Sequence, residues 1–256
     1  MDESPIATSS ARNYGPAKGF GYSIARRLPL LLPVLLAGLA LAPPASARVV
    51  ELGAGSSQAA VSACPNSPCR AVYQVTGYQG RSGNLRNPFI IRRDGYLVAF
   101  TVTLPELAEN QIESFNTRFG GPPEVRLATL RRGDKRKTRL NHRLLRQSEI
   151  FAVEDYLGSS PTFVFQQPLR VKKGNIVALT VPTWLPALAA DLGAGNWWRS
   201  SRLKGECGTD EELSPPSAQQ ELRDIIRYGC TYKRARLLYT ATYVPDPRPT
   251  VRDARE

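Results

Sequence analysis

Hydrophobic and polar positions alternate over short runs from about residue 71 onward, which is the period of a half-buried β-strand. Residues 96–104 show the alternation well, with one face carrying Tyr96, Val98, Phe100, Val102 and Leu104. The pattern predicts further strands at residues 71–78, 89–91, 125–130, 162–171, 176–181 and 231–244. In the last of these, Ala235, Leu237, Tyr239, Ala241 and Tyr243 share one face, and Arg234, Arg236, Thr240 and Thr242 share the other.

Turns rich in glycine, proline and asparagine separate these runs, and helices do not alternate with the strands. The pattern predicts an all-β protein, an antiparallel two-sheet sandwich or jelly roll. It also predicts one short helix near the C-terminus, at residues 217–228. Ser217 would cap this helix, Leu222, Ile225 and Ile226 would form its apolar stripe, and Gly229 would end it.

The first 47 residues have the layout of a bacterial export signal. Arg26 and Arg27 precede an apolar run at residues 28–41, which ends in the small-residue stretch 42–47. Fourteen apolar positions are fewer than the ~20 that a membrane-spanning helix needs. We therefore expect a signal peptide at 1–47 and a linker with a small cysteine loop at 48–70. The sandwich would occupy 71–244 and a disordered tail 245–256.

All four cysteines, Cys64, Cys69, Cys207 and Cys230, follow the expected cleavage site. An even number in an exported chain favours two disulfides. The turn-forming residues between Cys64 and Cys69 favour a local pairing, which leaves Cys207 with Cys230. A metal site at the C-x4-C spacing is the alternative. It lacks a nearby histidine or a second close cysteine pair, and we expect no metal and no cofactor.

The chain is basic, with a formal net charge of +12. The cations concentrate between residues 131 and 146, where Asp134 is the only acid. The residues expected to bind anions are Arg131, Arg132, Lys135, Arg136, Lys137 and Arg139, followed by Arg143 and Arg146. A cationic hairpin of this kind attracts polyanions, with an affinity that falls steeply with salt. The alternative is a solvated hairpin without a ligand.

The tryptophans indicate a second candidate surface. Trp184 follows a strand, and Trp197 and Trp198 lie after a glycine-rich stretch. Tryptophans at the rim of a sandwich can stack on sugar rings, and Asn196, Arg199, Ser200 and Arg202 could bond hydroxyls or a carboxylate. The alternative is that these indoles fill the end of the core.

Catalytic signatures are sparse. His142 is the only histidine, and its basic neighbours favour an exposed hairpin position over a catalytic base. Ser201 and Lys204 match a serine–lysine pattern, without the partner motifs that such enzymes carry. The acids Glu106, Glu109 and Glu113 are expected in a solvated loop. A pair of distant carboxylates for glycoside hydrolysis stays open.

Some of these motifs resemble uncharacterised exported β-sandwich proteins of actinobacteria. The likeness rests on Asn87-Pro88-Phe89, on Arg93-Asp94-Gly95-Tyr96 and on residues 168–175. There a strand closes on a V-x-x-G-D turn, in which Asn175 replaces the aspartate. Residues 179–186 continue the pattern, so the resemblance covers about residues 89–188 and the C-terminal cysteine-containing strand. It implies a jelly-roll-like fold and no activity.

Together these features predict a secreted, non-catalytic β-sandwich that binds a glycan or an anionic polymer at the cell envelope. No nucleic-acid partner and no membrane span after signal cleavage are expected. A secreted glycan hydrolase with an unidentified carboxylate pair is one alternative. The other is a structural or assembly protein whose sheet edges pair with further subunits.

Overall fold

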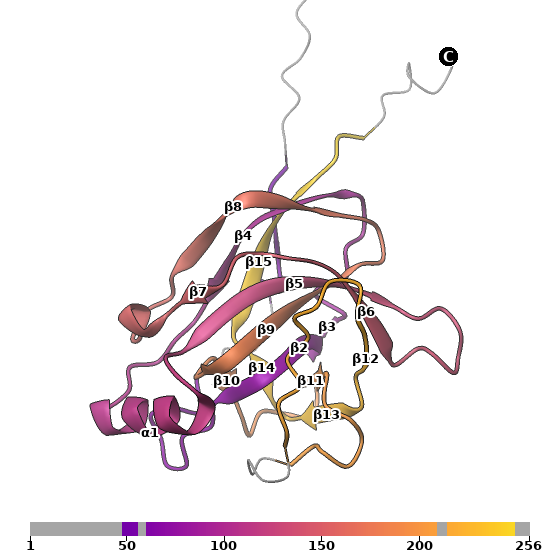
Figure 1. Cartoon of the computed structure of the whole chain (residues 1–256). Helices are drawn as coiled ribbons and strands as arrows, with labels where there is room; N and C mark the ends of the chain where they lie inside the picture. The colour runs from indigo at the N-terminus through magenta and orange to yellow at the C-terminus, as the bar shows by residue number, and fades with distance from the viewer. Residues whose placement is uncertain (1–47, 56–59, 209–213, 249–256) are drawn as a thin grey trace, which may run out of the picture. The chain divides into compact units, whose positions relative to one another are not determined.

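The computed structural model describes residues 48–55, 60–208 and 214–248, and these residues form two layers of antiparallel strands (Figure 1). The smaller sheet has four strands in the order β1-β15-β4-β8. Its strands are β1 (Val50–Leu52), β15 (Tyr239–Pro245), β4 (Gly95–Val102) and β8 (Thr162–Val171).

The larger sheet runs in the order β12-β6-β5-β9-β2-β11-β13, and β3 and β7 pair with β2 and β5 at its margins. Its strands are β12 (Ile225–Arg227), β6 (Asn141–Gln147), β5 (Glu124–Arg132), β9 (Ile176–Leu185), β2 (Val72–Ser82), β11 (Trp197–Ser200), β13 (Cys230–Lys233), β3 (Leu85–Arg86) and β7 (Phe151–Ala152). The short strands β10 (Leu188–Ala189) and β14 (Arg236–Leu237) form a separate pair. This arrangement confirms the all-β, antiparallel sandwich prediction.

The main core lies between the two sheets. Phe100 of β4 and Phe163 of β8 belong to the same buried cluster as Leu127 of β5 and Val181 of β9. Tyr239 of β15 stacks on Phe89, with ring centroids 4.2 Å apart, and its hydroxyl donates a 3.1 Å hydrogen bond to the Val177 carbonyl of the other sheet. Burial of apolar area between the layers therefore holds the sandwich together, and a few such bonds fix its register.

The larger sheet is covered on both faces, and β5 and β9 are therefore buried over most of their length. Its outer face buries a second cluster that includes Leu130, Leu144 and Tyr228. The segment after residue 214 crosses this face, and Gln219 is buried within it. The larger sheet therefore has a core on each side. The hairpin that joins β5 to β6 projects from one end of its strands, and the helix α1 (Glu109–Phe119) packs near the other end (Figure 1).

The single helix of the described residues is α1 (Glu109–Phe119), and its position differs from the prediction. Ile112, Phe115 and Phe119 recur at helical spacing and pack on the cluster that contains Trp184. Gly120, at a φ of 83°, ends the helix in the left-handed region. The expectation of a solvated loop around Glu109 was wrong, because this apolar stripe has a partner surface at the edge of the sheet. A short 3-10 turn, η1 (Glu154–Tyr156), follows later in the chain.

Residues 217–228 do not form the predicted helix. The Ser217 N–H donates to the Gln74 carbonyl, and the Gln219 N–H donates to the Thr76 hydroxyl. The end of the segment pairs with β6 as β12. Leu222 and Ile225 are about half exposed, so their spacing has no apolar surface to cover. Bonds to β2 and β6 thus replace those of a helix.

Three local predictions also need correction. The strand expected at 231–244 breaks at Arg234, which has a φ of 57°. A register shift between Leu97 and Ala99 turns Leu97 inward and leaves Tyr96 exposed. β1, in the expected linker, pairs with β15. The expected signal peptide at 1–47 and most of the expected tail lie outside the described residues.

Both predicted disulfides are present, Cys64–Cys69 and Cys207–Cys230. Two such crosslinks indicate folding in an oxidising, extracytoplasmic environment. Among the described residues, no helix has the length and apolar character that would let it cross a membrane.

Candidate functional site

The β5–β6 hairpin, which carries the basic run, has an ordered turn. The Gly133 N–H donates to the Asn141 carbonyl, and the Thr138 N–H donates to the Lys135 carbonyl, both at 2.9 Å. A side chain at position 133 would collide with the Thr138 carbonyl oxygen, so glycine is required there. The hairpin therefore holds its cations on a defined backbone.

Alternation along β6 sorts its side chains between the core and the solvent. His142 and Leu144 are buried and Arg143 is exposed, and a register shift at Leu145 leaves Arg146 exposed as well. Arg143 lies directly opposite Arg131 of β5 in the antiparallel register. Like charges in opposed positions destabilise a sheet by a few tenths of a kcal/mol or more. The hairpin thus concentrates positive charge at a cost in stability.

The turn between β8 and β9 adds cations that the sequence analysis did not assign to a site. Lys172 and Lys173 are both exposed. The Asn175 side chain accepts a 2.8 Å hydrogen bond from the Lys172 N–H, and Asp94 accepts one of the same length from the Lys173 N–H. Asn175 therefore acts as the turn-closing residue that the resemblance expected to be aspartate.

These two turns face each other across a groove of about 640 Å³. Six of its lining residues are cationic: Arg131, Arg132, Arg146, Arg170, Lys172 and Lys173. Asp134 is the only acid among the described lining residues, and it lies 3.6 Å from Arg131. Arg170 is already engaged by Asp246, through bonds of 2.7 and 2.8 Å that lower the pKa of the aspartate. The other cations leave the groove strongly positive.

A second, smaller hollow of about 220 Å³ shares one lining residue with the groove. Arg132 lines both spaces, and the hollow adds Arg139, Arg199 and Trp197. The fold thus brings Trp197 and Arg199, predicted for a sugar site, together with two arginines of the basic hairpin. We call this group of residues the hairpin face. It comprises the groove, the hollow and the exposed hairpin cations Lys135, Arg136, Lys137 and Arg143.

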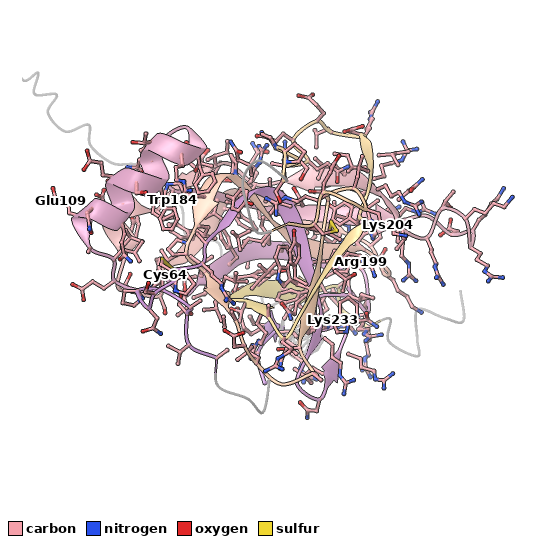
Figure 2. The ribbon with its side chains drawn as sticks, turned by 90° about the horizontal axis from the view of Figure 1, so that it is seen from below. Cys64, Glu109, Trp184, Arg199, Lys204 and Lys233 are labelled. Atoms are coloured by element: carbon pink, nitrogen blue, oxygen red, sulfur yellow. A yellow bond between two sulfur atoms is a disulfide. The ribbon has the colours of Figure 1, made fainter. Side chains whose placement is uncertain are left out.

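The three tryptophans do not form a common platform. Trp184 lies on β9 beneath α1 (Figure 2), is fully buried, and donates from its indole N–H to Asn116 at 2.9 Å. Trp197 and Trp198 are consecutive in β11, so their side chains point to opposite faces of the sheet. The expectation of a three-tryptophan rim was wrong, because burial under the helix and strand alternation separate the rings.

Trp198 and Asn196 are also buried. Trp198 stacks on Tyr232, with ring centroids 4.3 Å apart. Asn196 accepts a hydrogen bond from the Gly83 N–H and donates one to the Gly193 carbonyl, so it closes turns and does not face a ligand. Core filling is therefore the correct interpretation for these two residues and for Trp184.

Trp197 is half-buried, because one face of its ring packs on a glycine of the neighbouring strand. A side chain at Gly80 of β2 would overlap the Trp197 ring. The Arg199 guanidinium lies 5.9 Å from that ring and donates to the Tyr228 carbonyl at 3.0 Å. Trp197 and Arg199 are thus the two members of the predicted sugar site that reach the surface.

His142 is fully buried, and the expectation of an exposed hairpin residue was wrong. It packs between Tyr78 and Tyr228, and its Nδ1 lies 2.9 Å from the Leu140 carbonyl. A carbonyl only accepts, so Nδ1 carries the proton and Nε2 accepts from the Tyr78 hydroxyl. Burial, assisted by Arg199 and Arg132, lowers the pKa of His142 to about 4. The neutral ring is therefore a structural part of the hairpin base.

The other catalytic candidates do not converge either. Ser201 is buried and bonds the Thr76 N–H and the Ser217 carbonyl, and Lys204 is exposed, so the serine–lysine pattern is not on one helical turn. Glu109 and Glu113 are exposed on α1 (Glu109 in Figure 2), on the side away from many of the nitrogen-tipped side chains. Within the described residues, histidines, cysteines and acids form no group of three that could hold a metal ion.

Sequence reasoning found the hairpin cations from their density, but it missed Lys172 and Lys173. Their signal, two lysines before a Gly-Asn turn, is ordinary for a surface turn. Only the pairing of strands far apart in sequence places that turn beside the hairpin. Comparison of the chain with protein-family models, with curated proteins and with solved structures found no match.

Proposed function

We propose that this protein is an exported, non-catalytic β-sandwich that binds an anionic polymer of the cell envelope through the hairpin face. The observation that carries the proposal is the shared position of Arg132 in both spaces. It joins a groove lined by six cations to a hollow lined by two more, and Asp134 is the only acid lining either space among the described residues.

Charge and geometry both favour a polymer over a small ion. The cations lie along two adjoining spaces and an exposed hairpin tip, so a chain of regularly spaced anions can contact many of them at once. The opposed pair Arg131 and Arg143 supports this further, because bound phosphates would relieve its repulsion. The half-buried ring of Trp197 adds a surface on which a sugar of such a polymer can stack.

Export rests on two independent features. The basic and apolar layout of residues 1–47 is that of a signal, and both disulfides belong to an oxidising compartment. We expect protein isolated from its native host to begin at Arg48 and to contain no free thiol. Mass spectrometry that found Met1 retained and four reduced cysteines would contradict the localisation.

Binding is tested with the full, oxidised chain and fluorescently labelled inorganic polyphosphate, followed by anisotropy over a range of NaCl concentrations. Engagement of about four cations should weaken binding roughly 50-fold between 50 and 200 mM salt, on the slope known for single-stranded nucleic acids. Because polyphosphate contains no sugar, its binding measures the contribution of charge and charge spacing alone.

The decisive comparison uses two variants with the same change in net charge. Arg136→Glu/Lys137→Glu alters the hairpin tip, and Arg48→Glu/Lys204→Glu alters exposed cations elsewhere. We expect about tenfold weaker binding for the first and less than about twofold for the second. Equal losses in both variants, or no polyphosphate binding by the parent at low salt, would refute the proposal.

A further inference from the structure

A cavity of about 870 Å³ lies between α1 and strands β2, β11 and β13. It is bounded by the Cys64–Cys69 loop, the start of β2, the last turns of α1, and strands β11 and β13. Its volume is within the range of pockets that hold small organic molecules, about 300 to 1,000 Å³.

Two stacked aromatic pairs form its walls. Tyr73 and Phe119 stack with ring centroids 4.5 Å apart, and Trp198 and Tyr232 stack at 4.3 Å. All four rings line the cavity, together with Phe115 of α1. The pairs come from β2 with α1 and from β11 with β13, so the cavity exists only in the folded sandwich.

Arg202 connects the two pairs. Its guanidinium lies 4.4 Å from the centre of the Tyr73 ring, and it donates to the Tyr232 hydroxyl at 3.0 Å and to the Tyr73 carbonyl at 2.9 Å. Only 3% of Arg202 is exposed, although it lines the cavity. The site thus has a fixed, desolvated cation beside flat apolar rings.

The charge of Arg202 has no counterpart in the described part of the chain. No described carboxylate forms an ion pair with it, and its Nε–H is buried without a hydrogen-bond partner. The Trp198 indole N–H, which belongs to the same wall, is buried without a partner as well. Buried charges and donors are destabilising unless they are satisfied. An anion in the cavity would supply the countercharge that Arg202 lacks.

The other charged residues that line the cavity are mostly cationic. Arg70, Arg118, Lys233 and Arg234 also line the cavity, and Asp191 is the only carboxylate among the described lining residues. Asp191 already lies 3.3 Å from Arg70. The two carboxylates that a glycoside hydrolase needs are therefore not present among the described residues of this cavity.

We propose that this cavity is a binding site for a small organic anion that consists of a ring with an apolar face and a carboxylate. The ring would lie against the aromatic walls, and the carboxylate would be held by the positive charge of Arg202 and the other cations of the lining. Aryl acids and sugar acids share this chemistry. The site is separate from the hairpin face, since the two share no lining residue and Trp198 points to the opposite face of β11 from Trp197 and Arg199.

The test uses the full, oxidised chain and four probes: phenylacetate, glucuronate, acetate and benzyl alcohol. Titrations are followed by calorimetry and by the indole N–H signals in ¹⁵N-labelled protein, in which Trp184, Trp197 and Trp198 give three resonances. We expect one ring acid to bind at least tenfold more tightly than acetate or benzyl alcohol and to shift the Trp198 signal. Preference for phenylacetate or for glucuronate identifies the class of ring.

Variants locate the binding. Ala190→Trp adds a ring to the cavity wall, and Ala194→Trp makes the same change at an exposed position outside the cavity. We expect the first to lower ring-acid affinity at least tenfold and the second to leave it within about twofold, with polyphosphate binding equal in both. Arg202→Lys should also weaken ring-acid binding. If this buried variant does not fold, the comparison of Ala190→Trp with Ala194→Trp decides the question.

Three results would overturn the inference. The first is that neither ring acid binds with a dissociation constant below roughly 10 mM. The second is that acetate binds as tightly as the ring acids, and the third is that Ala190→Trp binds the ring acids as tightly as the parent does. None of these depends on polyphosphate, so failure here is distinguishable from failure of the proposed function.

Discussion

The hairpin face and the aromatic cavity are both cationic, but they present their charge in opposite ways. The hairpin face displays many exposed side chains on a groove and a turn, whereas the cavity holds one buried guanidinium between stacked rings. Exposed charges are individually weak and screened by salt, so they act through number. A buried charge is little screened and acts through position. The first surface suits a polymer and the second a single molecule.

The largest expected effect is a loss of folding stability that should disturb the aromatic cavity more than the hairpin face. The Cys207–Cys230 disulfide closes a sequence separation of 23 residues and joins β13, a wall of the cavity, to the chain beyond β11. Replacing both cysteines by serine should lower the free energy of unfolding by about 3 kcal/mol in guanidinium titrations. Ring-acid binding should fall as the wall loosens, and polyphosphate binding should persist.

The matched control is the double serine variant of Cys64 and Cys69, whose separation is only five residues. Its shorter loop should make the loss smaller, about 2 kcal/mol. A larger loss for this pair than for Cys207–Cys230 would contradict the chain-entropy argument.

Acid should weaken the base of the hairpin face through His142. Its pKa is about 4 in the folded protein and 6.5 in the unfolded chain, where it gains a proton first as the pH falls. Stability is therefore complete above pH 6.5 and is lost as the pH drops toward 4. Between pH 7.0 and 4.5 the parent should lose ~2 to 3 kcal/mol more than His142→Gln, in parallel denaturant titrations.

The subtraction of the His142→Gln curve removes the contribution of carboxylates, which titrate in both proteins. The cations that face this ring are Arg132 and Arg199. Identical pH dependence in the two proteins would show that His142 is already protonated or solvated in the folded state.

The contribution of the distant turn to the hairpin face can be measured with Lys172→Glu/Lys173→Glu. Both lysines line the groove, so reversal should weaken polyphosphate binding about tenfold, or about 1.4 kcal/mol. Ring-acid binding should stay within about twofold. Unchanged polyphosphate affinity would restrict the binding surface to the hairpin alone.

The smallest expected effect concerns the opposed arginines of the hairpin. Arg143→Thr removes a like-charge pair with Arg131 and introduces a good strand former, so stability should rise by roughly 0.5 kcal/mol. Polyphosphate binding should weaken two- to threefold. A loss of stability in thermal unfolding would mean that Arg143 makes a favourable contact that outweighs the repulsion.

Sequence patterns gave reliable information where they report local burial. Alternation located most of β4, β8 and β15, and cysteine spacing identified both disulfides. The same reasoning failed for the helix. The stripe at 217–228 resembles the one at Ile112, Phe115 and Phe119, and only the availability of a partner surface distinguishes the two.

The candidate sites show the same division. The hairpin cations could be named from composition because they are consecutive. Arg202 could be named as a carboxylate-binding candidate near the tryptophans, but its burial could not be foreseen, since that depends on Tyr73 and Tyr232, which are 129 and 30 residues away. A sequence pattern that depends on such distant partners has no short-range period to detect.

The sequence by itself therefore determined the class of fold, the crosslinks and the existence of a basic hairpin, because strand alternation, turn residues and charge density are local properties. The tertiary structure alone decided that His142 and Trp184 are buried, that Lys172 joins the hairpin face, and that Arg202 lies against Tyr73 and Tyr232. Those outcomes depend on which strands pair across long stretches of chain, and pairing is fixed by the burial of apolar area over the whole sandwich.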